Sequence, residues 1–197
     1  VDLAVTSDTG VVGDNVTTLT EPAFVGLAEA NAKIRVYANG VLVGQGVVGS
    51  DSSDGLLDNG LGEWEVTVEP LAYDDYLVTV EVEDLAGNVT RSSDYEWIAV
   101  DPYELNDTIS TATVLGSLKK ITKNDVVLHS RDDVDIWKYT AQDTGKVIFN
   151  VHFPHVIGNI DVEVRDMLGN VIMVADSLSD NEHIVIPVVK EEMYFIH

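Results

Sequence analysis

Alternation of apolar with polar or small residues runs through almost the whole chain and constrains its fold more than any other feature of the sequence. Successive side chains of a β-strand point to opposite faces of a sheet, so a period of two indicates half-buried strands. Helical periodicity is hard to find. The predicted strands are residues 33–38, 41–48, 63–69, 76–83, 134–140, 146–153, 160–166, 171–175, 183–189 and 193–196. The sequence therefore predicts an all-β fold.

Turn-forming residues separate the predicted strands at short intervals. Asn39-Gly40 lies between two strands and predicts a tight hairpin turn, because both residues tolerate a positive φ. Residues 84–88 (Asp-Leu-Ala-Gly-Asn) form another turn cluster after a strand. Short strands with regular turns are typical of antiparallel β-sandwiches. Residues 108–115 are an exception, since Asn106 or Asp107 is placed to cap a short helical turn there.

A break near residues 98–102 divides the chain into two predicted domains. Ile98-Ala99-Val100 ends a strand, and Asp101-Pro102 cannot continue it because proline lacks the N–H that a sheet ladder needs. We predict two tandem antiparallel β-sandwiches, one in residues 1–99 and one in residues 100–197. The chain begins at Val1 without a methionine or a signal-type segment, which predicts a piece of a longer protein.

The chain is strongly acidic, with 34 Asp and Glu against 11 Lys and Arg and a net charge of −23. Such a surface repels phosphate groups, which argues against nucleic acid and anionic membranes as partners. No stretch is long and apolar enough for membrane insertion. The lack of cysteine removes disulfides, thiol catalysis and cysteine-ligated zinc. Dense carboxylates are hard oxygen ligands, so Ca²⁺ is the cofactor that the composition favours.

Residues 1–99 resemble bacterial immunoglobulin-like repeats through several motifs that occur in the same order. These motifs are Ser7-Asp8-Thr9-Gly10, Asp14-Asn15, residues 20–26, Ala28-Glu29-Ala30, residues 34–37, Gly62-Glu63-Trp64 and residues 84–88. The resemblance implies an immunoglobulin-like sandwich. It also implies the work of such repeats, which act as spacers and adhesion modules in long arrays on bacterial surface and secreted proteins.

Three acidic residues of this first half form a second candidate metal site. Asp8, Asp14 and Asp84 lie at strand-connecting ends, where members of the repeat family often carry acids close to the next module. A cation held there would stiffen the joint between modules. The alternative is that Asp8 and Asp84 accept backbone N–H bonds as Asx turns.

The sequence departs from the repeat pattern at residues 49–62, where the family has a short turn. The inserted run carries Asp51, Asp54 and Asp58 among several glycines, and it predicts an exposed acidic hairpin loop. A calcium loop is one interpretation and a solvated loop is the other. The run lacks the odd-position spacing and the closing glutamate of an EF-hand.

Residues 101–197 resemble a bacterial pre-peptidase C-terminal domain. The matching motifs are residues 101–108, residues 111–116, residues 130–139, Phe153, His155, residues 158–162, residues 166–170 and residues 193–196. The resemblance implies a jelly-roll-like β-sandwich next to secreted peptidases or in other exported proteins. Relatives in bacterial collagenases are calcium-stabilised modules that bind substrate.

Two groups of side-chain oxygens in this second half are dense enough to need a cation. Glu104, Asn106 and Asp107 lie within four residues, and Asp132, Asp133 and Asp135 lie on the turn before a strand. Acids this close repel one another, and a shared cation relieves the repulsion. In collagenase relatives the entry acids and the later aspartates meet at one site. The predicted calcium ligands are Glu104, Asn106, Asp107, Asp132 and Asp135.

Alternatives to this calcium site remain open at the level of sequence. Asp133 is free to point to solvent, because neighbours on a strand face opposite ways. Asn106 and Asp107 would instead cap a turn if the later aspartates were solvated. Leu105 stands where the family usually has proline, which predicts a less rigid entry segment. The family pattern also continues past His197, which predicts a bare apolar edge at residues 193–196.

No set of residues predicts an enzyme. The sequence lacks a Gly-x-Ser-x-Gly elbow, a His-Glu-x-x-His helix and a Gly-rich phosphate loop. Trp64 and Trp137 lie in alternating strands, so we expect them in the core. The leading hypothesis is a non-catalytic module pair of a larger exported bacterial protein, extracellular or on the cell surface, that acts as a spacer, adhesion or substrate-attachment region beside neighbouring domains of its parent chain.

Two other functions stay open. One is a receptor module for an extracellular protein or glycan, which would need exposed aromatic side chains beside an acidic groove. The other is a secretion or maturation segment that is cleaved from a secreted peptidase. The sequence does not identify the parent protein, the ligand or the number of flanking repeats.

Overall fold

A computed structural model describes residues 1–51, 56, 59–116, 120–124, 126–128, 133–154, 158–178 and 180–197. All regular structure in this described part is β-strand, as the alternating pattern predicts. The chain divides into two compact units, Val1–Pro102 and Tyr103–His197. No helix in the described residues is suited to crossing a membrane.

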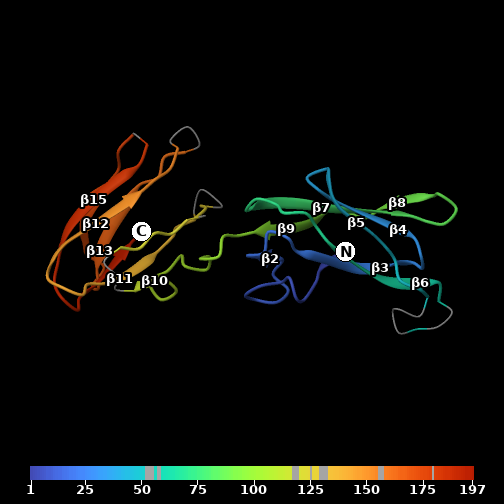
Figure 1. Cartoon of the computed structure of the whole chain (residues 1–197), viewed down its shortest axis with the longest axis horizontal. Helices are drawn as coiled ribbons and strands as arrows, with labels where there is room; N and C mark the ends of the chain where they lie inside the picture. The colour runs from blue at the N-terminus through green and yellow to red at the C-terminus, as the bar shows by residue number, and fades with distance from the viewer. Residues whose placement is uncertain are drawn as a thin grey trace. The chain divides into compact units, whose positions relative to one another are not determined.

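Unit 1 is a sandwich of two sheets (Figure 1). One sheet has the order β1-β3-β6, and the other has the order β2-β9-β7-β4-β5 with β8 paired to β7. All strand pairs are antiparallel except that of β2 with β9. The strands are β1 (Asp2–Leu3), β2 (Val16–Thr17), β3 (Ala23–Glu29), β4 (Lys33–Ala38), β5 (Val41–Val47), β6 (Leu61–Thr67), β7 (Asp74–Glu83), β8 (Val89–Arg91) and β9 (Tyr95–Ala99).

The core of unit 1 is built from the inward-facing half of each alternating strand. In β6, burial alternates along the whole strand and turns Trp64 and Val66 inward. Trp97 of β9 is fully buried, stacks on Tyr76 at 5.0 Å between ring centroids and meets Phe24 edge-on at 5.7 Å. Aromatic pairs in these geometries stabilise a core beyond the area they bury.

The hairpin predicted at Asn39-Gly40 is confirmed. Asn39 has φ 49° and Gly40 has φ 80°, so both central residues of the two-residue loop between β4 and β5 are in the left-handed region. This is the turn geometry whose twist matches the flanking strands. The Asn39 side chain adds a further tie, because its Oδ1 accepts the backbone N–H of Leu77 at 2.9 Å.

Unit 2 is a second sandwich with one large and one small sheet (Figure 1). The large sheet has the order β10-β11-β16-β13-β14, and the small sheet pairs β12 with β15. The strands are β10 (Thr113–Gly116), β11 (Trp137–Thr140), β12 (Gly145–Val151), β13 (Val162–Asp166), β14 (Val171–Ala175), β15 (Glu182–Val188) and β16 (Met193–Ile196). The core between the sheets includes Val164, Ile184 and Ile186.

The predicted bare edge at residues 193–196 is wrong. β16 lies in the middle of the large sheet and pairs with β11 on one side and β13 on the other. Tyr194, Phe195 and Ile196 are each at most 5% exposed. Because both edges of this strand are used, its apolar residues face neighbours of the same unit.

The predicted helical turn at residues 108–115 is also wrong in its second half. The Thr111 N–H donates to the Thr108 carbonyl at 3.0 Å, which closes a single turn, and the chain then enters β10. The side chain of Thr108, rather than that of Asn106 or Asp107, accepts the Thr111 N–H at 3.3 Å. β10 forms because its backbone pairs in parallel with β11.

Candidate functional site

The entry segment of unit 2 brings acidic side chains together with the turn before β11. One carboxylate oxygen from each of Glu104, Asp107 and Asp133 lies within 4.8 Å of the other two. An oxygen of Asp135 lies within the same distance of Glu104. Residues about thirty positions apart along the chain thus lie close together, Glu104 and Asp107 beside Asp133, and Glu104 beside Asp135.

Backbone hydrogen bonds hold these two segments side by side. The N–H of Ile136 donates to the carbonyl of Asn106 at 3.1 Å, and the N–H of Thr113 donates to the carbonyl of Ile136 at 2.9 Å. The stretch around residue 106 is therefore tied to the chain that leads into β11. These backbone hydrogen bonds determine which acidic residues of the two segments lie next to each other.

Asn106 is the most buried member of the group, with 1% of its surface exposed. Its Nδ2 donates to Oδ1 of Asp135 at 2.9 Å. Its Oδ1 is buried and accepts no hydrogen bond from the described residues. A buried acceptor without a donor costs about 1–3 kcal/mol, and a cation is one partner that satisfies it.

Leu105 gives the entry segment a sharp bend. Its φ is 70°, a left-handed conformation that an L-residue with a side chain adopts at a cost of about 1–2 kcal/mol. Proline, with φ locked near −65°, does not fit there. The bend at Leu105 separates Glu104 from Asn106 along the entry segment.

The predicted ligand set is matched only in part by this geometry. Asp132 lies outside the described residues. Asp133, for which the sequence left solvent open, is half-buried with an oxygen beside Glu104 and Asp107. The density of acids in residues 132–135 was the available signal, but the strand alternation assumed there does not apply because β11 begins only at Trp137.

The second candidate site of Asp8, Asp14 and Asp84 is not assembled. The Asp8 side chain accepts the N–H of Gly13, and Asp14 accepts the N–H of Val16 at 3.0 Å, so these two belong to one loop. Val16 pairs with the part of β9 that faces Asp75, at the start of β7. Asp84 follows the other end of β7, a strand of 10 residues. At the usual rise of a β-strand per residue, the two ends of β7 are about 30 Å apart.

Asp84 instead organises a turn. Its carboxylate accepts the backbone N–H of Asn88 at 2.8 Å and the Asn88 side-chain amide at 2.6 Å. These hydrogen bonds hold the pKa of Asp84 below its ordinary value of 3.8. The structure therefore confirms the alternative in which Asp84 forms an Asx turn.

The acidic insertion of unit 1 lies mostly outside the described residues, including Asp54 and Asp58. Asp51 is described, and its Oδ1 accepts the N–H of Gly60. A backbone amide is therefore the partner of this carboxylate oxygen.

The aromatic residues divide between core and surface. Trp64 is 5% exposed in the core of unit 1, as predicted. Trp137 is only half-buried, at the border of the unit 2 core. Tyr95 donates to Asp2 Oδ1 and Asn15 Oδ1, and burial raises its pKa to about 12.

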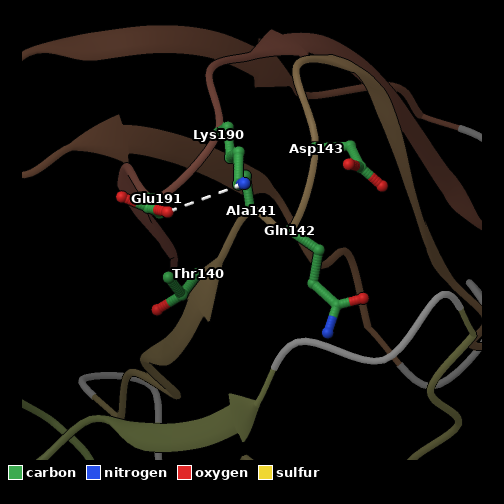
Figure 2. A pocket seen from close by; sticks show the side chains of 6 residues that line it. All are labelled: Thr140, Ala141, Gln142, Asp143, Lys190 and Glu191. Atoms are coloured by element: carbon green, nitrogen blue, oxygen red, sulfur yellow. Dashed lines mark ion pairs between the residues drawn. The ribbon is translucent and has the colours of Figure 1, made fainter.

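A shallow hollow at the end of β11 offers little chemistry. It has a volume of about 390 Å³ and is lined by Thr140, Ala141, Gln142, Asp143, Lys190 and Glu191 (Figure 2). Figure 2 shows Lys190 and Glu191 pointing toward each other, and their charged atoms are 3.8 Å apart. A single exposed ion pair of this kind contributes little free energy and is not a catalytic arrangement.

Comparisons with known proteins bear on unit 1. Residues 1–101 match the family model described as a bacterial Ig-like domain. No curated protein matches the chain. Among solved structures, the chain is similar to one described as the BSP domain of a biofilm-associated protein, at 16% identity and a TM-score of 0.29. That match covers 89% of this chain and 23% of the other, so the chain spans about a quarter of its length.

Proposed function

We propose, on the premise that this chain belongs to the bacterial Ig-like domain family through residues 1–101, that it is a non-catalytic module pair of a larger exported bacterial protein. Unit 1 would act as a spacer or adhesion module. Unit 2 would be a pre-peptidase-type sandwich that calcium stabilises and that serves attachment beside its neighbours. The setting would be extracellular or the cell surface.

One observation carries the calcium part of this proposal. Carboxylate oxygens of Glu104, Asp107 and Asp133 lie within 4.8 Å of one another, a spacing at which a single cation can bind all three. Calcium accepts six to eight oxygen ligands at 2.3–2.6 Å and tolerates irregular geometry, which suits acids from two separate segments. Magnesium demands a near-ideal octahedron and fits such a set less well.

A second observation supports a cation over solvated surface acids. The amide of Asn106 is buried beside Asp135 and its Oδ1 has no donor among the described residues. A side-chain oxygen on a solvated surface forms hydrogen bonds with water. Asn106 is only 1% exposed, so its Oδ1 is shielded from bulk solvent. Both segments would be locked together by the ion, which would stiffen the entry to unit 2.

The test is calcium-dependent melting of the intact chain. We expect the midpoint of unit 2 to rise with calcium, by an amount that corresponds to about 2.7 kcal/mol at a hundred times the dissociation constant. The variants Asp107→Asn and Asp133→Asn should lose most of this rise. Asp176→Asn, an exposed acid elsewhere in unit 2, is the matched control and should keep it.

An unchanged midpoint at millimolar calcium would remove the ion from the proposal. An equal rise with magnesium, or an equal rise in the two cluster variants, would show non-specific screening of the acidic surface instead. The spacer role is tested separately, by a binding screen against matrix proteins and glycans. Tight binding of a single ligand would favour the receptor function over the spacer.

A further inference from the structure

Among the residues that the structure describes, no strand pairs with the outer edge of β12 in the small sheet of unit 2, and this edge lies beside a cleft. Within the described residues β12 pairs only with β15. The cleft has a volume of about 1350 Å³, and its walls come from β12, from the inner side of β10 and β11, and from residues 120–124 and 126. Among the lining side chains are Leu115, Trp137, Tyr139, Val147 and Phe149.

The order of the strands explains where this cleft lies. β15 packs near β14, which is one edge of the large sheet, so β12 lies toward the opposite edge. The large sheet continues past β12 through β11 to β10. The small sheet is therefore narrower than the large sheet on the side of β10 and β11. A further strand beside β12 would cover the inner face of β10 and β11.

The side chains along this gap are apolar and only partly covered. Val147, Phe149 and Val151 alternate along β12 as its inward face, and all three are half-buried although they pack on the core. Leu115 and Trp137 across the gap are half-buried as well. Apolar surface that stays accessible inside a cleft gains free energy when another apolar group covers it.

The charge of the cleft has the opposite sign to the rest of the molecule. Lys120, Lys123 and Lys146 line it, together with a single acid among the described lining residues, Asp143. The chain as a whole has 11 basic and 34 acidic residues. Among the described residues none of the three lysines forms an ion pair, whereas all three basic residues of unit 1 pair with glutamates.

We propose that this cleft binds an extended acidic peptide, which adds to the free edge of β12 as a further strand. Backbone hydrogen bonds along the edge would supply affinity, as in other cases of strand addition. Alternate apolar side chains of the peptide would enter the cleft, and acidic side chains would reach Lys120 and Lys146 at its rim. The proposal does not depend on calcium, because the lining residues do not include the acidic cluster.

The test uses a labelled peptide of the same length as β12, which has 7 residues, with valine and glutamate in alternation. Fluorescence anisotropy should show saturable binding to the intact chain that weakens with salt. The double variant Lys120→Glu/Lys146→Glu should weaken it by about fivefold or more. Lys190→Glu, a lysine outside the cleft, is the matched control and should bind like the parent chain.

Two further peptides separate strand addition from simple charge attraction. A peptide with lysine in place of glutamate should not bind. A glutamate peptide with N-methyl groups on alternate amides should also fail, because it cannot donate along one edge. Equal binding of the N-methyl peptide would overturn the proposal, and so would equal binding to the double variant.

The remaining outcome concerns self-association. If sedimentation shows a dimer that the Lys120→Glu/Lys146→Glu variant abolishes, and the peptide does not compete with it, then a second copy is the occupant and the peptide proposal falls. A monomer that binds the acidic peptide supports it. Circular dichroism of each variant verifies that the loss of binding is not a loss of folding.

Discussion

The two units of this chain contain the same turn but close their cores in different ways. Asp84 with Asn88 in unit 1 and Asp166 with Asn170 in unit 2 make matching side-chain and backbone hydrogen bonds, around Gly87 and Gly169 with φ of 89° and 83°. Yet unit 1 covers its core with its own strands, and unit 2 leaves an edge and a cleft. Local turn chemistry is therefore independent of how completely a sandwich is closed.

Close approach of the sheets is what closes unit 1. Gly44 and Gly46 of β5 lie against Val66 of β6, where an added Cβ would come within 2.8 Å of a valine methyl. Gly62 is tighter still, since its Cβ would be 2.3 Å from the carbonyl oxygen of Gly49. Unit 2 has no such contact at Gly145, where the space around the Cβ position is open. The first two of the four predictions below test this difference in closure, and the other two compare the entry to unit 2 and the turn that both units contain.

The largest effect should come from removing a tryptophan side chain that packs on the core of each unit. Trp97→Ala in unit 1 should cost about 3–5 kcal/mol, because the fully buried ring packs on Phe24 and Tyr76. Trp137→Ala in unit 2 should cost less than half of this, because that ring is half-buried at the cleft. Denaturant unfolding of the two variants measures both values, and equal losses would contradict the difference in closure.

A smaller loss is expected where an added methyl group meets backbone. Gly62→Ala should destabilise unit 1 by about 2–3 kcal/mol, since the Gly49 carbonyl cannot rotate away as a side chain would. Gly145→Ala in unit 2 is the matched control and should change the stability by less than about 0.5 kcal/mol. Thermal melting decides this, and a tolerated Gly62→Ala would mean that the strands there are not closely packed.

The bend at Leu105 tests the entry to unit 2. Leu105→Gly should raise the stability of unit 2 by up to about 1 kcal/mol, because glycine adopts a positive φ without strain. Leu105→Pro should lower it by about 2 kcal/mol and weaken the proposed binding of calcium, because proline forces the opposite sign of φ. The two variants must move the melting midpoint in opposite directions, and a stabilising proline would show that the bend is not needed.

The smallest effect concerns the turn that the units share. Asparagine hydrogen bonds lower the pKa values of Asp84 and Asp166 below 3.8 in the folded state. Their contribution to stability is therefore complete above the unfolded pKa and is lost as the pH falls through the folded pKa. We expect Asp84→Ala and Asp166→Ala to lose similar amounts of stability at neutral pH, and the difference from the parent chain to shrink as the pH falls below the ordinary carboxyl pKa of 3.8.

Melting curves across this pH range, with Asp176→Ala as the control, measure the effect of the turn. A difference that stays constant down to the lowest pH would mean that the carboxylate charge has no role. Unequal losses at Asp84 and Asp166 would show that the surrounding unit changes the strength of the same turn.

Strands and turns of both units were open to prediction because they depend on local pattern. β4, β14 and β16 match the predicted ranges to the residue, and the Asn39-Gly40 hairpin is present as expected. The strand expected at residues 134–140 begins only at Trp137, because the preceding residues carry the acidic turn.

The sequence showed which two segments are acidic, but it did not show which of their residues come together. Three residues with side-chain oxygens within four positions marked each segment, two acids and an asparagine in the first and three aspartates in the second. The structure brings an oxygen of Asp133 to Glu104, where the sequence favoured the neighbours of Asp133. A period of two assigns faces only within a strand, and this stretch is irregular backbone. The second candidate site failed for a related reason, since sequence does not show that β7 separates Asp84 from Asp14 by its whole length.

By itself, the sequence determined that this chain folds into β-strands, where they turn, where its two halves divide and that its surface is acidic. Each of these follows from residue types a few positions apart, which act through backbone geometry and solvation. The tertiary structure alone decided that residues 193–196 are a central strand and that β12, among the residues that the structure describes, pairs with β15 alone. These features depend on which strands pair across long separations in the chain, and the short-range pattern of residues does not show that pairing.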